Sequence, residues 1–224
     1  MFRGITVAAM LLVNNPGSWG AIYAPLQHAP WHGWTPTDLI FPFFLFIVGI
    51  TTHLATTARR ARGASDGELV RQVLTRGALI VLFGLLLNAF PFFPLERITG
   101  LRLPGVLQRI GVCYICAALF TLRTTVRQQI SIIAALLLGY WAAMTLIPVP
   151  GQVSIGRVLL DEPSASLAAW LDRSVFGEHV WRSSKTWDPE GLLSTIPAIG
   201  TTMLGVLTGR WLGRTDRPLS DRLT

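Results

Sequence analysis

The sequence predicts an all-α protein, a polytopic transmembrane helical bundle of about six spans with both termini in the cytoplasm. Hydrophobic residues make up 51% of the 224-residue chain and charged residues only 14%, whereas a soluble domain usually carries about 25% charged residues. The apolar residues gather in blocks of about 20, which is the length that a helix needs to cross the hydrocarbon core. The basic residues stand in short clusters between these blocks.

Six apolar segments have the length of membrane-spanning helices, and they are too long and too little alternating for barrel strands. The first, 2–23, begins like a signal peptide, with Arg3 before an apolar run. However, Asn14, Asn15 and Pro16 stand where a cleavage site of small residues should lie, so we expect a retained span. The other five follow at 37–56, 73–92, 103–122, 129–149 and 191–212.

The distribution of Lys and Arg orients these spans. One side of the predicted bundle holds twelve of them: Arg3, Arg59, Arg60, Arg62, Arg71, Arg76, Arg123, Arg127, Arg210, Arg214, Arg217 and Arg222. The other side holds six over longer loops: Arg97, Arg102, Arg157, Arg173, Arg182 and Lys185. Because cytoplasmic loops carry the excess of basic residues, we expect the first side to be cytoplasmic. The net charge of +7 then reflects topology, and we expect no nucleic-acid partner.

The loop between the first two spans carries unusual polar residues. Asn14 and Asn15 lie near a membrane segment, where polar groups by default mark a functional site, although an amide can also simply bond a neighbouring helix. His28 and His32 have a spacing that would suit a metal on a helix, but Pro30 lies between them and argues against a helix, so we predict no metal site. A catalytic imidazole and a plain interfacial histidine both remain open.

Asp38 opens the second span. A carboxylate there is favoured by the helix dipole, or it orients a catalytic imidazole. An aromatic belt at the membrane interface would explain Trp31 and its neighbours Trp19 and Trp34.

Further polar residues lie in or beside the later spans. Gln108 and Arg109 fall within the fourth span, and an intramembrane Arg normally faces a cavity or a partner, for which we name Asp38 or Glu190. Trp187 with Asp188 and Glu190 forms the outer mouth of the sixth span, as a sugar-binding group or as a helix start. Segment 164–176 is predicted to be a surface helix.

Two sets of small residues in the spans are best explained by helix packing. Cys113 and Cys116 lie in an apolar run and behave there as small hydrophobic side chains. Gly205, Gly209 and Gly213 repeat at four-residue spacing, which lets helices approach closely.

Four segments in this order resemble the heparan-α-glucosaminide N-acetyltransferase family and its bacterial relatives. They read FRGITVAAMLLVNNPG, HAPWHGWTPTDLIFPFFLFIVG, LPGVLQRIGVCY and TWDPEGLLSTIPAIGTTMLGVLTG. They touch the first, second, fourth and sixth spans. The resemblance implies an integral membrane protein, here of a bacterial inner membrane. Such a protein moves an acetyl group from cytoplasmic acetyl-CoA to the amine of a terminal glucosamine on the other side.

The resemblance also implies roles for individual residues. His28 matches the active-site His of the family's His-Ala-x-Trp motif, as a base or as an acetyl-carrying nucleophile. Asn14 matches a family Asn and is expected to donate to the oxyanion, and Asp38 is expected to orient His28. For acetyl-CoA we expect Arg3, Arg109 and Gln108. For the amino-sugar acceptor we expect Trp31, Trp187, Asp188 and Glu190.

Two departures from the family pattern affect these expectations. The family's Asp two residues before its Phe-Arg-Gly is absent, and family members usually have more spans after the sixth. We therefore expect one transmembrane acyltransferase domain over 1–224 that is incomplete, with 150–190 as its extracytoplasmic loop. A transporter or flippase-like binding module and an inactive fragment stay as alternatives. The sugar and the oligomeric state, a homodimer included, stay open.

Overall fold

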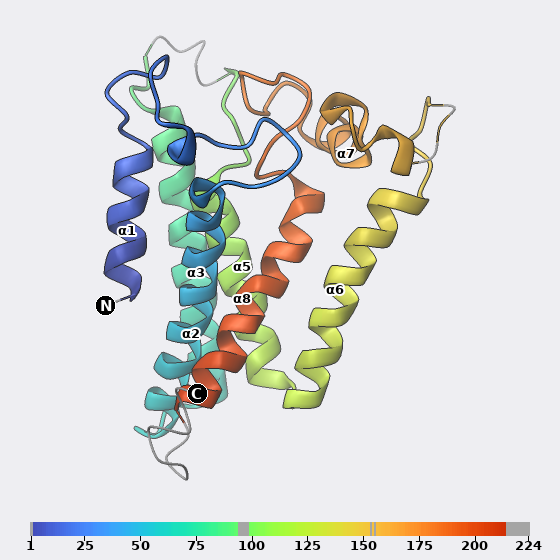
Figure 1. Cartoon of the computed structure of the whole chain (residues 1–224). Coiled ribbons are helices and arrows are strands. Elements are labelled where there is room, and N and C mark those ends of the chain that lie inside the picture. The colour runs from blue at the N-terminus through green and yellow to red at the C-terminus, as the bar shows by residue number, and fades with distance from the viewer. Residues whose placement is uncertain (1, 94–98, 153, 155, 214–224) are drawn as a thin grey trace.

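The computed structural model describes residues 2–93, 99–152, 154 and 156–213, and its regular elements there are all helical (Figure 1). The α-helices described are α1 (Phe2–Val13), α2 (Ile40–Arg60), α3 (Asp66–Ala89), α5 (Val106–Arg123), α6 (Val126–Leu146), α7 (Leu167–Phe176) and α8 (Leu192–Leu212). Five of them, α2, α3, α5, α6 and α8, are long and apolar enough to cross a membrane. The predicted all-α class with several membrane-spanning helices is confirmed, with five candidate spans among the described residues, and the cytoplasmic location of both termini stays a prediction.

Helix α1 is shorter than the predicted span 2–23, because it ends at Val13. The Asn14 amide turns back and donates to a carbonyl of the last helical turn at 2.9 Å, and Pro16 has no N–H with which to continue the ladder. Its 12 residues reach about 18 Å, whereas the hydrocarbon core is about 30 Å thick. The prediction of a full first span is therefore wrong within the described residues.

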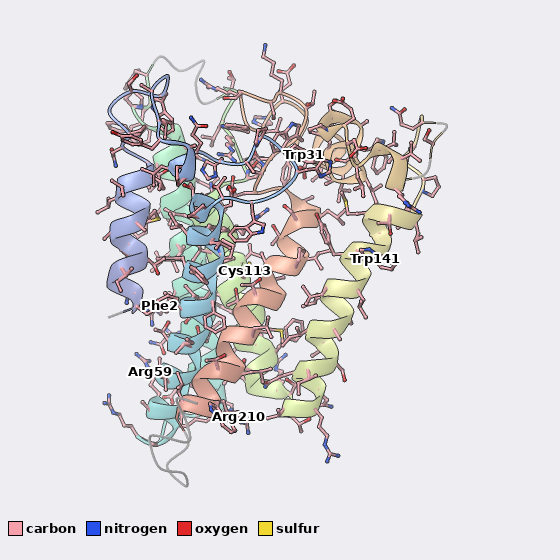
Figure 2. The ribbon with its side chains drawn as sticks, in the orientation of Figure 1. Phe2, Trp31, Arg59, Cys113, Trp141 and Arg210 are labelled. Carbon is pink, nitrogen blue, oxygen red and sulfur yellow. The ribbon has the colours of Figure 1, made fainter. Side chains whose placement is uncertain are left out.

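Arg3 belongs to the first turn of this short helix α1. The Phe2 ring packs edge-on against Phe43 in the first turns of α2, with 5.6 Å between ring centroids (Figure 2). Figure 1 places this end of α1 beside the middle of the bundle. The start of α1 therefore does not reach the end of the bundle where α2 ends, and the cytoplasmic location expected for Arg3 stays a prediction.

The five long helices are connected alternately at two ends of the bundle. The loops before α2, before α5 and between α6 and α8 form one end, here called the loop end; the α2–α3 turn, the α5–α6 turn and the end of α8 form the other, here called the basic end (Figure 1). Arg59 and Arg210 both lie at the basic end (Figure 2). Arg97, Arg214, Arg217 and Arg222 fall outside the described residues.

Two helices begin earlier than their apolar segments predict, because each starts with a capping box. Ser65 accepts from the backbone N–H of Glu68, and Glu68 accepts from the Ser65 N–H at the start of α3. Thr125 and Gln128 make the same exchange at the start of α6. Such boxes satisfy N–H groups that a helix start leaves open, so a polar first turn precedes each apolar segment.

Helices α2 and α8 meet backbone to backbone. A Cβ on Gly205 would collide with the carbonyl oxygen of Phe46, and one on Gly49 with that of Thr202. The predicted close approach of small residues is thus confirmed at Gly205. At the loop end the predicted surface helix is also present, as a 3₁₀ turn (Pro163–Ala165) followed by α7.

Candidate functional site

A histidine–aspartate pair stands at the loop end, just before α2. The Nδ1 atom of His28 lies 2.6 Å from Oδ1 of Asp38. The His28 side chain is 69% exposed and that of Asp38 only 27%, so the carboxylate is sheltered while the ring faces outward. The predicted contact between these two residues is present.

The loop folds around the Asp38 carboxylate. Its Oδ2 accepts the N–H of Thr35 at 2.8 Å and the N–H of Ala29 at 3.1 Å, and it also accepts the Thr35 hydroxyl at 3.1 Å. Pro36 starts a 3₁₀ turn (Pro36–Leu39) that leads into α2, and its fixed φ suits a first helical position. Asp38 therefore sits at a helix start, as its sequence position suggested, and also holds the His28 loop closed.

This geometry determines which ring nitrogen can react. A carboxylate only accepts hydrogen bonds, so Nδ1 of His28 carries the proton. A neutral imidazole then has its lone pair on Nε2, which is the arrangement of a general base or a nucleophile oriented by an acid.

Three tryptophans connect the His28 loop to the segment before α8. The Trp31 and Trp187 rings meet edge to face with centroids 5.3 Å apart, and Trp187 meets Trp181 in the same way at 5.8 Å. The indole N–H of Trp31 donates to the carbonyl of Leu160 at 2.6 Å. The two predicted acceptor residues Trp31 and Trp187 are thus in contact, and Figure 2 shows Trp31 at the loop end.

Asp188 and Glu190 are turned inward toward an arginine. Arg102 donates two hydrogen bonds to Asp188, from Nε to Oδ2 at 2.8 Å and from Nη2 to Oδ1 at 2.5 Å. It also donates a hydrogen bond to Glu190. The Asp188 side chain is fully buried. Burial raises the pKa of the Glu190 carboxyl above its ordinary value, although the charges of Arg102 and Arg109 oppose this. Both carboxylates therefore already have a hydrogen-bond partner within the protein, namely Arg102.

Arg109 does not pair with Asp38 or Glu190 as expected. Its Nη2 donates to the carbonyls of Pro189 at 2.9 Å and Gly191 at 3.2 Å, and to the Ser194 hydroxyl. Pro189 and Gly191 stand just before α8 and Ser194 lies in its first turn, so the start of α8 is anchored to α5. Gln108 is buried beside Gly84 of α3, where its Nε2 has no partner among the described residues.

Asn14 stands apart from the histidine–aspartate pair. Its side-chain donor is used on its own helix, and no hydrogen bond joins it to His28 or Asp38 among the described residues. The expected oxyanion role of Asn14 stays a prediction.

A cavity of about 390 Å³ lies between α1, α2, α3 and α5. Its walls near the basic end include Arg59, Gln72 and Arg76, and toward the loop end they include Phe44 and Leu107. Arg59 donates to the side-chain oxygen of Gln72. Such a volume is typical of small-molecule sites, and its cations suit an anionic ligand.

Arg3 lines this cavity, whereas Arg109 and Gln108 do not. The predicted cofactor residues are therefore divided between two places. Sequence reasoning missed Arg59 and Arg76 as cavity residues because it treated them as topology signals. It missed Arg102 because the partner of this residue lies 86 residues away.

The described residues include no group of three or more His, Cys, Asp or Glu side chains that could hold a metal ion. His28 and His32 instead have separate partners, because the Nε2 of His32 lies 2.7 Å from Oδ1 of Asp161.

Comparison with known proteins agrees with the motif pattern. The family model described as heparan-alpha-glucosaminide N-acetyltransferase, catalytic, matches residues 1–221. The chain is 29% identical to the human and to the mouse heparan-alpha-glucosaminide N-acetyltransferase, over 94% of its own length in both cases. It spans 37% of the human protein and 38% of the mouse protein.

Proposed function

Because the chain belongs to the heparan-alpha-glucosaminide N-acetyltransferase catalytic family, we propose that it transfers an acetyl group across a bacterial inner membrane. The donor is acetyl-CoA and the acceptor is the amine of a glucosamine-type sugar. The basic end faces the cytoplasm and the loop end faces outward. The observation that carries this proposal is the 2.6 Å contact between Nδ1 of His28 and Asp38, which leaves Nε2 of an exposed ring for chemistry.

The cavity at the basic end supports binding of the donor. Coenzyme A carries several phosphate charges, for which Arg59 and Arg76 are suitable partners. The apolar walls farther along suit its flexible arm. The inner end of the cavity at Phe44 is six residues from Asp38 along the chain, or about 10 Å of helix, so a thioester at that end would be close to the His28 loop.

His28 supports acetyl transfer by either of two routes. As a base, Nε2 takes the proton of the attacking amine while the new N–C bond forms, the C–S bond breaks and coenzyme A leaves as a thiolate. As a nucleophile, Nε2 first forms its own bond to the acetyl carbon and releases the thiolate. The sugar amine then attacks this carbon, the bond from Nε2 to the acetyl carbon breaks, and the released imidazole takes up the amine proton on Nε2. In both routes Asp38 stabilises the positive charge that develops on the ring.

The proposal is tested with the full chain reconstituted in vesicles, with labelled acetyl-CoA and a panel of glucosamine-ended sugars. We expect acetylated sugar with the wild type, and a loss of about 10²- to 10⁴-fold with His28→Ala, because a proton-transfer group contributes that much.

The matched control is His32→Ala. This residue belongs to the same loop and also pairs with a carboxylate, but the side chains of His32 and Asp161 are 65% and 89% exposed, and exposed pairs contribute little to stability. His32→Ala should keep transfer near the wild-type rate. Label that crosses the membrane without any acetylated product would overturn the proposal in favour of a transporter.

A further inference from the structure

The buried ion pair of Arg102 and Asp188 lies outside the chemistry proposed above. Arg102 belongs to the loop before α5, and Asp188 to the segment before α8. Asp188 also donates its backbone N–H to buried Asp172 of α7 at 3.2 Å, and its Oδ1 accepts the Glu190 N–H at 2.9 Å. Asp188 thereby joins three separate parts of the loop end.

The charges at this point depend on one another. Burial acts to lower the pKa of Arg102, but hydrogen bonds and charges from Asp188 and Glu190 outweigh it, so the pKa lies above its usual value. Without the guanidinium, two buried carboxylates would lose their cation. Breaking a buried pair in this way is strongly unfavourable, so the segment that carries Asp188 would have to move.

This segment also carries Trp187, the residue just before Asp188. Trp187 packs against Trp31 with 5.3 Å between ring centroids, and Trp31 is three residues after His28. The loop that contains Trp31 is closed at its base by Asp38. A displacement of Trp187 therefore reaches the loop that orients His28.

We propose that Arg102 and Asp188 are positioning residues for the His28 loop and act through the contact between Trp187 and Trp31. Neither touches the reacting atoms. This inference rests on the proposed acetyl transfer for its kinetic consequence, but the coupling itself is a property of the fold. The other reading is that the ion pair only stabilises the start of α8.

The coupling is measured by fluorine NMR on the full chain labelled with 5-fluorotryptophan, with resonances assigned by Trp31→Phe and Trp187→Phe. In Arg102→Met both the Trp187 and the Trp31 resonances should shift. Asp188→Asn is the second variant. It removes the charge at nearly constant side-chain volume, so it should disturb folding less than Arg102→Met does. Arg60→Met is the matched control, because it breaks the Arg60–Asp66 pair at the basic end; it should leave both resonances in place.

The kinetic consequence separates positioning from stability. A displacement of about 1 Å at a reacting group costs about 10²-fold in rate. The kcat/KM for the sugar should therefore fall by about that factor in Arg102→Met, while the KM for acetyl-CoA stays unchanged because its cavity lies elsewhere. Arg102→Lys should recover only part of the rate, since an ammonium cannot make the paired contact to a carboxylate.

Two results would overturn the inference: a Trp31 resonance that stays at its wild-type position in both folded variants, or sugar kinetics that stay at wild-type values. If the wild type transfers no acetyl group, only the proposed function is refuted. The fluorine spectra then still test the coupling between the ion pair and the His28 loop, because they do not depend on activity.

Discussion

Asp38 contributes to the proposed chemistry through the hydrogen that it holds on Nδ1 of His28. An asparagine at this position can present its NH₂ to the ring, which then keeps its proton on Nε2 and loses the reactive lone pair. We expect Asp38→Asn to lower the rate of acetyl transfer by about 10²-fold or more.

The rate is measured at saturating acetyl-CoA, with circular dichroism as the check that α2 remains formed. Thr35→Ala serves as the comparison, since it removes one of the contacts to Oδ2 and leaves Oδ1 on His28. Equal rates in Asp38→Asn and the wild type would contradict the assigned tautomer.

Single residues also show how far sequence reasoning reaches. The contact between His28 and Asp38 was predictable because both belong to one motif within ten residues. The ion pair of Arg102 with Asp188 was not predictable, because residues 86 positions apart come into contact only after the helices pack. Arg109 was correctly expected to need partners, but two of them are backbone oxygens just before α8. Every residue type has such an oxygen, so the sequence does not identify these partners.

At the scale of elements, the α2–α8 crossing depends on the absence of one side chain. Gly205→Ala would place a methyl group against the Phe46 carbonyl, and overpacking of this kind costs about 1–3 kcal/mol. We expect a lower melting temperature in detergent micelles.

Gly139→Ala on α6 is the matched control, because its Cβ would meet nothing within 4 Å. In a helix this change is worth about 0.5–1 kcal/mol of added stability, so its melting temperature should rise. A Gly205→Ala protein as stable as the wild type would show that α2 and α8 tolerate wider separation.

The start of α8 should respond to pH through Glu190. Burial raises its pKa in the folded state, so the folded protein binds this proton more tightly than the unfolded chain does. Its contribution to stability is fully present below the unfolded pKa of about 4.3 and is lost as the pH rises through the raised folded value. The melting temperature of the wild type should therefore fall relative to that of Glu190→Gln across this window. A constant difference between the two proteins would contradict the raised pKa.

Elements differ in how well the sequence predicts their ends. The five long helices were predictable because apolar length is a local property. The starts of α3 and α6 lie earlier because polar capping boxes extend them. The first span was overestimated because its apolar residues continue past Asn14 and Pro16, where the backbone turns.

At the scale of the whole molecule, the two proposed substrates bind at two separate ends. A substitution at one end should therefore weaken the binding of one substrate and leave the other unchanged. Arg76 lines the cavity and lies over the Tyr114 ring at 6.0 Å. Arg76→Met should raise the KM for acetyl-CoA by about tenfold, since a charge-assisted hydrogen bond is worth about 1.5–3 kcal/mol, while the KM for the sugar stays unchanged.

Both constants come from initial rates with one substrate varied at a time. Arg71→Met is the control, because Arg71 lies on the same helix but does not line the cavity. An equal rise of the two KM values in Arg76→Met would mean that the cavity and the loop end are not separate sites.

The backbone contact of α2 with α8 has a mechanical consequence. Asp38 stands just before α2, and the segment with Trp187 and Glu190 stands just before α8. Because the two helices meet backbone to backbone at Gly49 and Gly205, we expect them to move as one rigid body, together with the two groups that precede them. We therefore expect no rocking motion that opens the loop end between α2 and α8, so the proposed substrates would have to enter beside this fixed pair of helices.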